Sequence, residues 1–413
     1  MKRSWFRRRS AARLVLRGLG ILVGLQAVIV AVLTAHATWR KLRARTQGFP
    51  YEQLPETRVG ENLLQVYGYG RELYDAMLSA IDSAQESIYL ETFIWKSDGV
   101  GRAFKERLAQ KAAAGVDVYV IFDGFANLVV PPAFKRFPAS IHARQYQPIH
   151  RPWHLLDPRR YALEHRKLLV VDGRTAFVGG YNLGSLYATA WRDTHLRIAG
   201  PAAAQFAQLF VAFWNRHCAR GERITHHYPQ RFDPLIVPRY TDPLQLTFPI
   251  RNMYIAAIER AEQHILLTNA YFVPDHILLN ALKAAAGRGV DVQILLPWIS
   301  NHAAADWVAR GYFTDCLRAG IRIFAYQAMM HAKTCTIDGQ WSTIGTANLD
   351  RLSSVGNYEL NVEIYSAELA RQMETLFARD KAFAVEITRA GWSARPWYVK
   401  LSERILAPLR VLM

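Results

Sequence analysis

Two stretches of the sequence decide the fold: HRKLLVVDG, residues 165–173, and HAKTCTIDG, residues 331–339. Both follow the pattern H-x-K-x-x-x-x-D-G, and the second begins 166 residues after the first. Asn182 and Asn348 follow the two stretches at the same spacing, each three residues after a Gly. A single H-x-K is weak evidence, but two copies in register indicate that the chain contains an internal duplication.

Each motif has the pattern of a strand, an Asp-Gly turn and a returning strand, because Asp-Gly is a preferred hairpin turn. On such a strand, residues two apart point to the same face, which places a His and a Lys side by side in each copy. Asp172 and Asp338 occupy the turns. We count both with the candidate catalytic residues of the motif, but their position favours fixing the hairpin over contact with substrate.

The repeated polar side chains suit chemistry on a phosphate group. If the halves face each other, one Lys and one Asn from each provide four donors, which stabilise a five-coordinate phosphorus. One imidazole can attack phosphorus to give a phosphohistidine, while the other protonates the leaving oxygen and later deprotonates an alcohol or water. The candidates are the histidines His165 and His331 and the phosphate ligands Lys167, Lys333, Asn182 and Asn348.

An acidic residue lies 28 positions after each motif histidine, as Asp193 and as Glu359. A carboxylate that holds an imidazole by its far nitrogen follows the logic of a catalytic triad, so these acids are candidates for orienting the histidines. An exposed acid on a strand is the alternative. The three cysteines Cys218, Cys316 and Cys335 are widely spaced, and no metal-ligand cluster is visible, so we expect neither a metal nor another cofactor.

The sequence around the motifs predicts an α/β domain that occurs twice. In each half a helix leads to a strand, and an Ala-rich helix that ends in Gly leads to another strand. Alternating helices and strands are typical of layered α/β domains. The chain therefore divides into a first half at 46–218, a connection rich in proline at 219–244, and a second half at 245–390.

Composition and charge narrow the classes of partner. The chain has 413 residues, 51% of them apolar, which excludes a disordered tail or a small disulfide scaffold. The formal charge of +17 is uneven, because residues 1–45 carry eleven Lys and Arg and no acid. The rest of the chain is only mildly basic, so we expect an anionic membrane surface, and not nucleic acid, as the partner. No obligate protein partner is inferred.

The basic N-terminal segment 1–45 surrounds an uncharged apolar run at 18–35. As a helix the run would be about 27 Å long, slightly less than the roughly 30 Å of a bilayer's hydrocarbon core. A spanning or inserted helix, a cleaved signal peptide and an interfacial helix are the alternatives. The C-terminal segment 391–413 is amphipathic, and either lies at a membrane interface or packs on the body.

The paired motifs resemble the phospholipase D superfamily, and further stretches resemble bacterial cardiolipin synthases of the phospholipase D type. The resemblance covers about residues 55–390. It implies two phospholipase D-like α/β halves that share one active site, transphosphatidylation without a metal, and a phosphohistidine intermediate. It also implies that His165 is the nucleophile and His331 the general acid and base. The stretches that carry it are LETFIWKSDGVG (90–101), HRKLLVVDG (165–173), FVGGYNLG (177–184), YFVPD (271–275) and TIGTANLDRLS (343–353).

The resemblance implies transfer of a phosphatidyl group between two phosphatidylglycerol molecules to give cardiolipin and glycerol, at the inner membrane of a bacterial cell, with the side left open. A phospholipase D hydrolase and a phosphatidyltransferase that uses phosphatidylethanolamine are alternatives with the same fold. A nuclease is disfavoured by the apolar N-terminal run and by the mild charge of the body. A non-catalytic scaffold is disfavoured because His and Lys are intact in both copies.

Two local features depart from the simplest expectation. The family's G-S-x-N appears as GGYN at 179–182 and as GTAN at 345–348, so the hydroxyl is absent from the first copy and is Thr346 in the second. We therefore expect one phosphate-side hydrogen bond to be missing. Between Lys135 and Tyr161, basic and aromatic residues interleave, which suits an anionic headgroup and a membrane interface as well as it suits a solvated loop.

Overall fold

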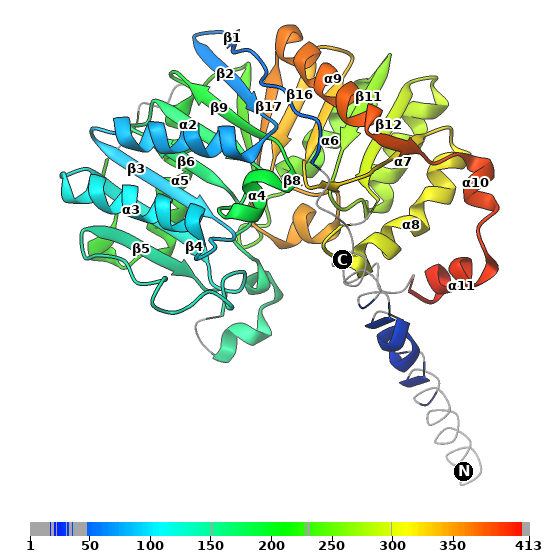
Figure 1. The fold of residues 1–413 in the computed structure, drawn as a ribbon, viewed down its shortest axis with the longest axis horizontal. Coiled ribbons are helices and arrows are strands. Elements are labelled where there is room, and N and C mark those ends of the chain that lie inside the picture. Colours follow the sequence, from blue (N-terminus) through cyan, green and yellow to red (C-terminus); the bar gives the residue numbers. More distant parts are fainter. Residues whose placement is uncertain are drawn as a thin grey trace.

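In the described part of the chain, two eight-stranded sheets form the body of the protein, one from each half (Figure 1). The computed structural model describes residues 17, 20–21, 23–29, 31–32, 35, 48–149, 152–226, 228, 232–298 and 300–406. Each sheet lies between helices, so the α/β class expected from the sequence is confirmed.

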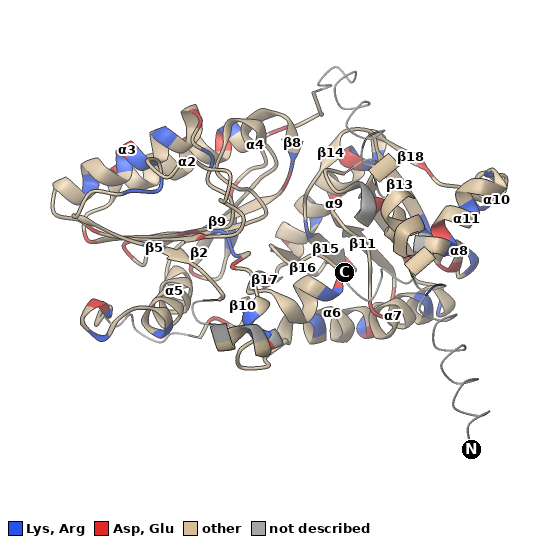
Figure 2. Cartoon of the chain, turned by 90° about the horizontal axis from the view of Figure 1, so that it is seen from below, with Lys and Arg blue, Asp and Glu red and all other residues tan. Residues whose placement is uncertain are grey.

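The first sheet has the strand order β1-β2-β9-β7-β6-β3-β4-β5. Helices α2 and α3 cover one face, and α5 covers the other (Figure 2). The strands are β1 (Thr57–Val59), β2 (Asn62–Tyr67), β3 (Ser87–Thr92), β4 (Asp117–Asp123), β5 (Ile141–Tyr146), β6 (Leu168–Val171), β7 (Thr175–Gly179) and β9 (His195–Ala199); the helices are α2 (Gly70–Ser83), α3 (Gly99–Ala113), α4 (Ser185–Thr189) and α5 (Ala203–His217).

The second sheet repeats this plan with the order β10-β17-β16-β15-β11-β12-β13-β18. Seven strands of each sheet correspond in order, from β2 and β10 to β5 and β13. The strands are β10 (Ile236–Thr241), β11 (His264–Thr268), β12 (Asp291–Pro297), β13 (Arg322–Tyr326), β15 (Thr334–Ile337), β16 (Trp341–Gly345), β17 (Glu359–Tyr365) and β18 (Ala384–Glu386); the helices are α6 (Pro249–Arg260), α7 (His276–Gly287), α8 (Ala303–Arg318), α9 (Ala367–Ala382), α10 (Arg389–Ser393) and α11 (Trp397–Leu406).

Strand β6, which follows the first motif, is buried on both faces. Leu168 and Val170 pack in the core beneath α5, whereas Leu169 and Val171 pack in the core beneath α2 and α3. This alternation explains why LLVV contains no polar residue, since each face of the strand meets a helical layer. The strand is therefore held firmly, and the segment that precedes it is fixed in place.

Both hairpin turns begin with Asp-Gly, as the sequence predicts, but each loop has three residues and not the two of the simplest Asp-Gly turn. Val171 pairs with Thr175, so the first loop has three residues, and Asp172 at its start has a positive φ of 52°. The Asp172 carboxylate accepts hydrogen bonds of 2.8–2.9 Å from the backbone N–H groups of residues 85–87. Asp338, with φ 53°, holds residues 262–264 in the same way, so both acids fasten their hairpin at the end of the strand opposite the motif histidine.

The Asp172→Ala variant is expected to lose about 2 kcal/mol of unfolding free energy, because three backbone donors lose a charged acceptor. Urea denaturation followed by circular dichroism measures this loss. Asp75→Ala, at an exposed position on α2, is the control and is expected to change stability by less than about 0.5 kcal/mol. A stable Asp172→Ala protein without activity would contradict the structural role.

The two halves share one hydrophobic core and a buried ion pair. The core beneath α5 continues into the second sheet through Ile344, Leu360 and Val362. Arg192 of the first half donates to Asp380 of α9 at 3.0 and 2.7 Å, and both side chains are 2% exposed. Removing one partner of such a pair typically costs about 3–5 kcal/mol, so this contact fixes the halves relative to each other.

Two boundaries expected from the sequence need correction. Residues 236–241 lie not in the connection but in β10, which pairs with β17 at the edge of the second sheet. Pro238 is tolerated there, because an edge strand leaves one side without ladder hydrogen bonds. The C-terminal segment begins inside α10, where buried Trp392 packs on Phe313 with ring centroids 5.1 Å apart, whereas α11 exposes Trp397.

Most of the basic N-terminal segment 1–45 lies outside the described residues, as do residues 407–413 of the C-terminal segment. The described residues of the apolar run, 20–21, 23–29, 31–32 and 35, are helical. Among the residues that the structure describes, we find no helix that combines the length and the apolar character needed to cross a membrane.

Candidate active site

Each motif histidine is held in place by the backbone of the other half. The N–H of His165 donates to the carbonyl of Tyr358 at 3.1 Å, and the N–H of Tyr358 donates to the carbonyl of Leu163 at 2.9 Å. In the second motif, the N–H of His331 donates to the carbonyl of Arg192 at 2.7 Å. Short strands β8 (Trp191–Arg192) and β14 (Met329–Met330) pair beside that contact. The two motifs therefore meet at the interface between the halves.

The orienting carboxylates are exchanged between the halves. His165 Nδ1 lies 2.9 Å from both carboxylate oxygens of Glu359, and His331 Nδ1 lies 2.6 Å from Asp193 Oδ2. Each histidine thus binds the acid that belongs to the other motif. With Nδ1 engaged, Nε2 is the nitrogen of each ring available for chemistry. The two side chains are 11% and 7% exposed, so this chemistry takes place in a largely desolvated site.

The motif lysines lie immediately beside the histidines. Lys167 Nζ donates to the His165 carbonyl at 2.6 Å, and Lys333 Nζ donates to the His331 carbonyl. Each His-x-Lys pair lies just before its strand begins, at Leu168 and at Thr334, and not within the strand as the sequence suggested. The geometry still brings amine and imidazole together, because the segment is extended and is clamped by the other half.

Burial and neighbouring charge shift the pKa values of all four groups. Burial lowers the pKa of Lys167 to about 7 and that of Lys333 to about 8. Burial, followed by the charges of both lysines, holds the pKa of His165 well below its usual range. Burial and Lys333 lower the pKa of His331 to about 3, and Lys167 contributes to this shift. Each lysine therefore acts on both histidines, as expected for one shared site.

The two orienting acids have unlike pKa values. Burial raises the pKa of Glu359 to about 7, although Lys167 and Thr346 oppose this shift. Burial also acts to raise the pKa of Asp193, but the charges of His331 and Lys333 outweigh it and leave this pKa below the usual value. The carboxylate beside His331 is thus firmly ionised, whereas the one beside His165 is close to its midpoint at neutral pH.

The asparagines that follow the two motifs are both buried. Asn182 is 2% exposed, and its Oδ1 accepts a hydrogen bond from the N–H of Ile94 at 3.1 Å. Asn348 is 6% exposed, and its Oδ1 has no hydrogen-bond partner among the described residues. The Asn182 oxygen is thus engaged, which leaves its amide NH₂ group to serve a phosphate.

Aromatic rings line the site, and the sequence motifs did not identify them. Phe93 contacts His165 edge-on with ring centroids 4.7 Å apart, and Lys167 Nζ lies 5.1 Å from the same ring. Trp191 and Tyr271 lie 5.3 and 6.3 Å from the His331 ring. Phe93 and Tyr271 lie in two of the stretches that carry the family resemblance, whereas Trp191 is marked only by its place two residues before Asp193.

The missing hydroxyl of the first copy has a steric explanation. Thr346 Oγ1 donates to Glu359 Oε2 at 2.5 Å, so this hydroxyl supports the orienting acid. At the equivalent Gly180, a Cβ atom would lie 2.0 Å from Asp193 Oδ1. The first copy lacks a side chain here because Asp193 fills the space.

The Gly180→Ala variant is accordingly expected to lose about 100-fold or more in turnover, because the added methyl group displaces Asp193 from His331. Turnover on phosphatidylglycerol in detergent micelles measures the loss. Thr346→Ser, which keeps the hydroxyl, is the matched change in the second copy and is expected to stay within about threefold of the parent. Full activity of Gly180→Ala would show that the Asp193 position is not needed.

A buried ionic cluster supports the first motif from beneath. Arg166 donates to Glu164 at 2.9 Å and to Glu91 at 2.7 Å, and its guanidinium lies 4.1 Å from the Phe213 ring centroid. The N–H of Glu164 donates to Asp123 at 2.9 Å. The second motif has Ala332 in place of Arg166, so duplication gave no signal for this cluster.

Among the described residues, no group of three or more His, Cys, Asp or Glu side chains is arranged to hold a metal ion. Cys316 and Cys335 are buried, and burial raises the pKa of the Cys335 thiol well above its usual value. The two motifs and their orienting acids bring two imidazoles, two amines and two carboxylates to the interface between the halves.

Comparison with known proteins agrees with this geometry. Residues 77–214 and 254–381 match a family described as cardiolipin synthase, PLD-like domain, one match in each half. The major cardiolipin synthase of Bacillus subtilis (strain 168) is 32% identical over 374 residues, which cover 84% of this chain and 76% of that protein. A cardiolipin synthase of Staphylococcus aureus (strain Mu50) is 31% identical over 372 residues, covering 84% and 74%.

Solved structures show the same fold at low sequence identity. The phosphatidylserine synthase of Haemophilus influenzae Rd KW20 superposes with a TM-score of 0.66 at 13% identity, covering 92% of this chain and 98% of that one. Polyphosphate kinase from Porphyromonas gingivalis gives a TM-score of 0.53 at 14% identity, covering 89% and 57%. The chain therefore belongs to the phospholipase D superfamily and, within it, to the family of cardiolipin synthases, which are phosphatidyltransferases.

Proposed function

We propose that the protein makes cardiolipin from two molecules of phosphatidylglycerol and releases glycerol. The observation that carries this proposal is the pair of histidines, each bonded to a carboxylate of the other half. Such a site is suited to a two-step displacement at phosphorus, because it offers one nucleophile and one proton carrier. The relatives named cardiolipin synthase support the choice of lipid.

In the first step, His165 Nε2 attacks the phosphorus of the donor phosphatidylglycerol. The bond between phosphorus and the glycerol headgroup oxygen breaks, and His331 gives its proton to that oxygen, so that glycerol leaves. Lys167, Lys333, Asn182 and Asn348 stabilise the charge on the non-bridging oxygens. The product is a phosphatidyl group bonded to His165.

In the second step, the terminal hydroxyl of another phosphatidylglycerol attacks the same phosphorus. His331 takes the hydroxyl proton, the bond between His165 and phosphorus breaks, and cardiolipin is released. The proton that His331 gives in the first step is taken back in the second, so the cycle consumes no net proton. Water in place of the lipid hydroxyl would instead give phosphatidic acid.

The unlike carboxylates support this division of roles. Ionised Asp193 stabilises a positive imidazolium on His331, which suits a general acid. Glu359, with its pKa raised to about 7 by burial, stabilises such a charge less, so His165 remains a neutral nucleophile. Burial, followed by the charge of Lys333, keeps the pKa of His331 low in the free enzyme, and a negative phosphate bound beside the lysines offsets the second of these causes.

The test of the proposed function is a product analysis. Purified full-length protein is incubated with phosphatidylglycerol, and lipids are separated by thin-layer chromatography and identified by mass spectrometry. Cardiolipin and glycerol in equal amounts are the expected products. Phosphatidic acid alone would show a hydrolase, and cardiolipin formed only after phosphatidylethanolamine is added would show that the donor is a different lipid.

The dependence of kcat/KM on pH is expected to be a narrow bell with its maximum close to pH 7. Above that pH the rate falls because Lys167 and Lys333, with pKa values of about 7 and 8, lose the charge that binds phosphate. Below it the rate falls because Glu359 becomes protonated. The apparent values belong to the coupled site as a whole. Initial rates from pH 5 to 9.5 in detergent micelles measure the curve, and a plateau up to pH 9.5 would contradict it.

The proposed place of action is the bacterial inner membrane, where the anionic phospholipid substrate resides. The eleven basic residues of segment 1–45 support a membrane surface as the partner. Nucleic acid is not proposed as a substrate, and no obligate protein partner is proposed.

A further inference from the structure

The loop that follows β4 exposes three large apolar side chains. Phe125, Leu128 and Val129 are 63%, 67% and 82% exposed. The same loop is firmly attached on its inner side, where Phe134 and Phe137 pack against the Trp95 ring at 6.1 and 5.6 Å. The apolar tip is therefore held outward by a rigid base, which is unfavourable in water unless a partner covers it.

A second apolar group lies in the loop between β5 and the first motif. This loop contains two short 3₁₀ helices, η1 (Pro152–Leu156) and η2 (Pro158–Tyr161). Trp153, Leu156 and Tyr161 are 60%, 86% and 49% exposed. We call the six exposed side chains of the two loops the apolar rim; its members are Phe125, Leu128, Val129, Trp153, Leu156 and Tyr161.

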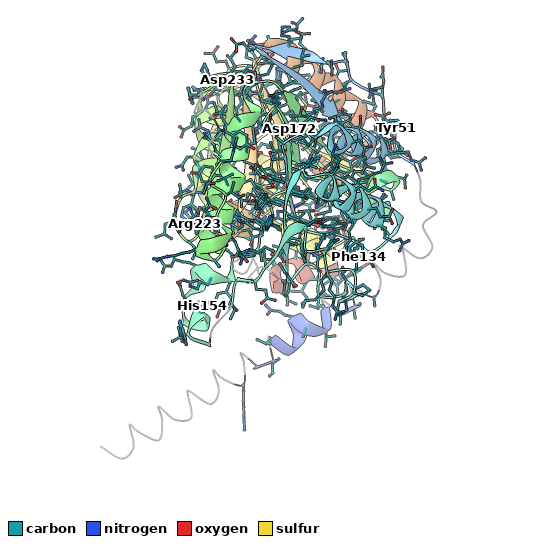
Figure 3. All side chains as sticks on the ribbon, turned by 90° about the vertical axis from the view of Figure 1, so that its left-hand side faces the viewer. Tyr51, Phe134, His154, Asp172, Arg223 and Asp233 are labelled. Atoms are coloured by element: carbon teal, nitrogen blue, oxygen red, sulfur yellow. The ribbon has the colours of Figure 1, made fainter. Side chains whose placement is uncertain are left out.

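The apolar rim lies at the active-site end of the first sheet. Asn127, 1% exposed, donates to the carbonyl of Phe93 at 2.7 Å, and Phe93 is the ring that contacts His165. In Figure 3, His154 and Phe134 lie at one end of the molecule, whereas Asp172 and Asp233 lie toward the other. The two loops of the rim therefore border the site, and the hairpin turn lies far from it.

Charge around the rim selects an anionic partner. Residues 124–163 contain six Lys and Arg and a single acid, Asp157. Arg159 and Arg160 pair with that acid and Arg144 pairs with Glu222, which leaves Lys135 and Arg136 as the described cations of this stretch without an ion pair. Further elements lie at the same end of the molecule: in Figure 1, the amphipathic helix α11, the described part of the N-terminal helix and the segment coloured for residues 152–161 all lie at the lower side of the view. Gln26 Nε2 of that N-terminal helix donates to the Ile405 carbonyl of α11 at 2.8 Å, which joins these two elements. Exposed Trp397 and Tyr398 of α11 add amphipathic rings of the kind found at lipid interfaces.

We propose that the apolar rim rests on a bilayer of anionic phospholipid and holds the paired histidines over the headgroup layer. Apolar tips enter the interfacial region, and the basic side chains around them meet lipid phosphates. Donor and acceptor lipids then reach the site without leaving the bilayer. This inference rests on the proposed function for its choice of lipid, but the docking itself does not require turnover.

The first experiment measures docking without catalysis. Full-length His165→Ala protein is studied by hydrogen–deuterium exchange in detergent micelles, and in nanodiscs of phosphatidylglycerol with phosphatidylcholine or of phosphatidylcholine alone. Peptides covering 124–131 and 152–161 are expected to exchange about tenfold more slowly in the anionic nanodiscs. The β10 peptide, 236–241, is expected to be unchanged. Equal exchange of the rim peptides in all three media would overturn the proposal.

A second arm uses matched substitutions at the two ends of the molecule. Phe125→Glu places a charge in the rim, and Phe232→Glu, at a position 72% exposed beside Asp233, places the same charge at the far end. Phe125→Glu is expected to lower the rate on anionic vesicles about tenfold and to leave the rate in micelles within twofold. Phe232→Glu is expected to leave both rates unchanged. An equal loss of rate in vesicles and micelles would show that Phe125→Glu does not act through membrane docking, and would overturn the proposal.

The outcomes separate docking from the proposed function. If the parent protein makes no cardiolipin but the rim peptides are protected in anionic nanodiscs, the lipid chemistry is wrong and the docking surface stands. If cardiolipin forms while the rim peptides stay unprotected, the proposed lipid chemistry stands and the proposed docking surface is wrong. Slower exchange of the rim peptides in detergent at raised protein concentration would show that a second copy of the chain covers the rim. This result would overturn the proposal that the rim docks on a bilayer.

Discussion

Alanine at His165 or at His331 is expected to lower cardiolipin formation by at least about 10⁴-fold, since each ring supplies a step that no other described side chain at the interface can supply. His165 forms the covalent bond to phosphorus, and His331 carries the proton. The rates are measured on phosphatidylglycerol in detergent micelles. His276→Ala, at an exposed position at the start of α7, is the control and is expected to keep full activity.

A substrate with a good leaving group separates the two roles. Phosphatidyl-p-nitrophenol releases nitrophenolate without needing a proton donor. The His331→Ala variant is therefore expected to give a burst of about one nitrophenolate per site and to retain lipid bound to the protein, whereas His165→Ala is expected to give no burst. A burst from His165→Ala and none from His331→Ala would exchange the roles of the two residues. Activity of either variant close to the parent would contradict the mechanism.

The duplication made much of the fold predictable. Helix-then-strand patterns at 80–91 and 257–267 correspond to the pairs α2–β3 and α6–β11. The Ala-rich helices that end in Gly correspond to the pairs α3–β4 and α7–β12, because Gly and β-branched residues give strong local signals at helix ends and strand starts. The boundary at 219–244 was less accurate. Prolines in that segment suggested a connection, but β10 is an edge strand, and an edge strand accepts a proline that a central strand would not.

The candidate site was predictable as a set of residues but not as a set of partners. The 28-residue spacing identified Asp193 and Glu359, yet it applies within each half, and the structure instead bonds each acid to the histidine of the other half. Spacing along the chain carries no information about whether an acid contacts the histidine of its own half or that of the other half. Packing decides this, through contacts such as the bond from the His165 N–H to the Tyr358 carbonyl.

Functional residues that do not recur in the second copy could not be predicted from the duplication. The Arg166 cluster and the Arg192–Asp380 pair occur in one half only or link unlike positions, so no second copy marked them. Gly180 was noticed as a departure, but the sequence offered no cause for it. Its reason is the volume of the Asp193 carboxylate, which becomes visible only when both segments are folded together.

The exchanged carboxylates lead to the second large expected effect. Asp193→Asn is expected to reduce turnover on phosphatidylglycerol by about 10⁴-fold, because an amide cannot stabilise the imidazolium form of His331 and favours the wrong tautomer. Glu359→Gln is expected to cause a comparable loss through His165. Both substitutions keep the size of the side chain, so thermal unfolding curves close to that of the parent are expected and serve as the control for folding.

The nitrophenyl substrate distinguishes crossed pairing from pairing within each half. If Asp193 serves His331, Asp193→Asn keeps the nitrophenolate burst, since the first displacement then needs no proton and His165 is intact. Glu359→Gln in turn slows the burst itself, because the nucleophile loses the acceptor that fixes its tautomer. Pairing within each half requires the opposite pattern, with the burst lost in Asp193→Asn and kept in Glu359→Gln. The two variants therefore test the 2.6 and 2.9 Å contacts directly, since each acid reports on the histidine that it touches and not on the one in its own half.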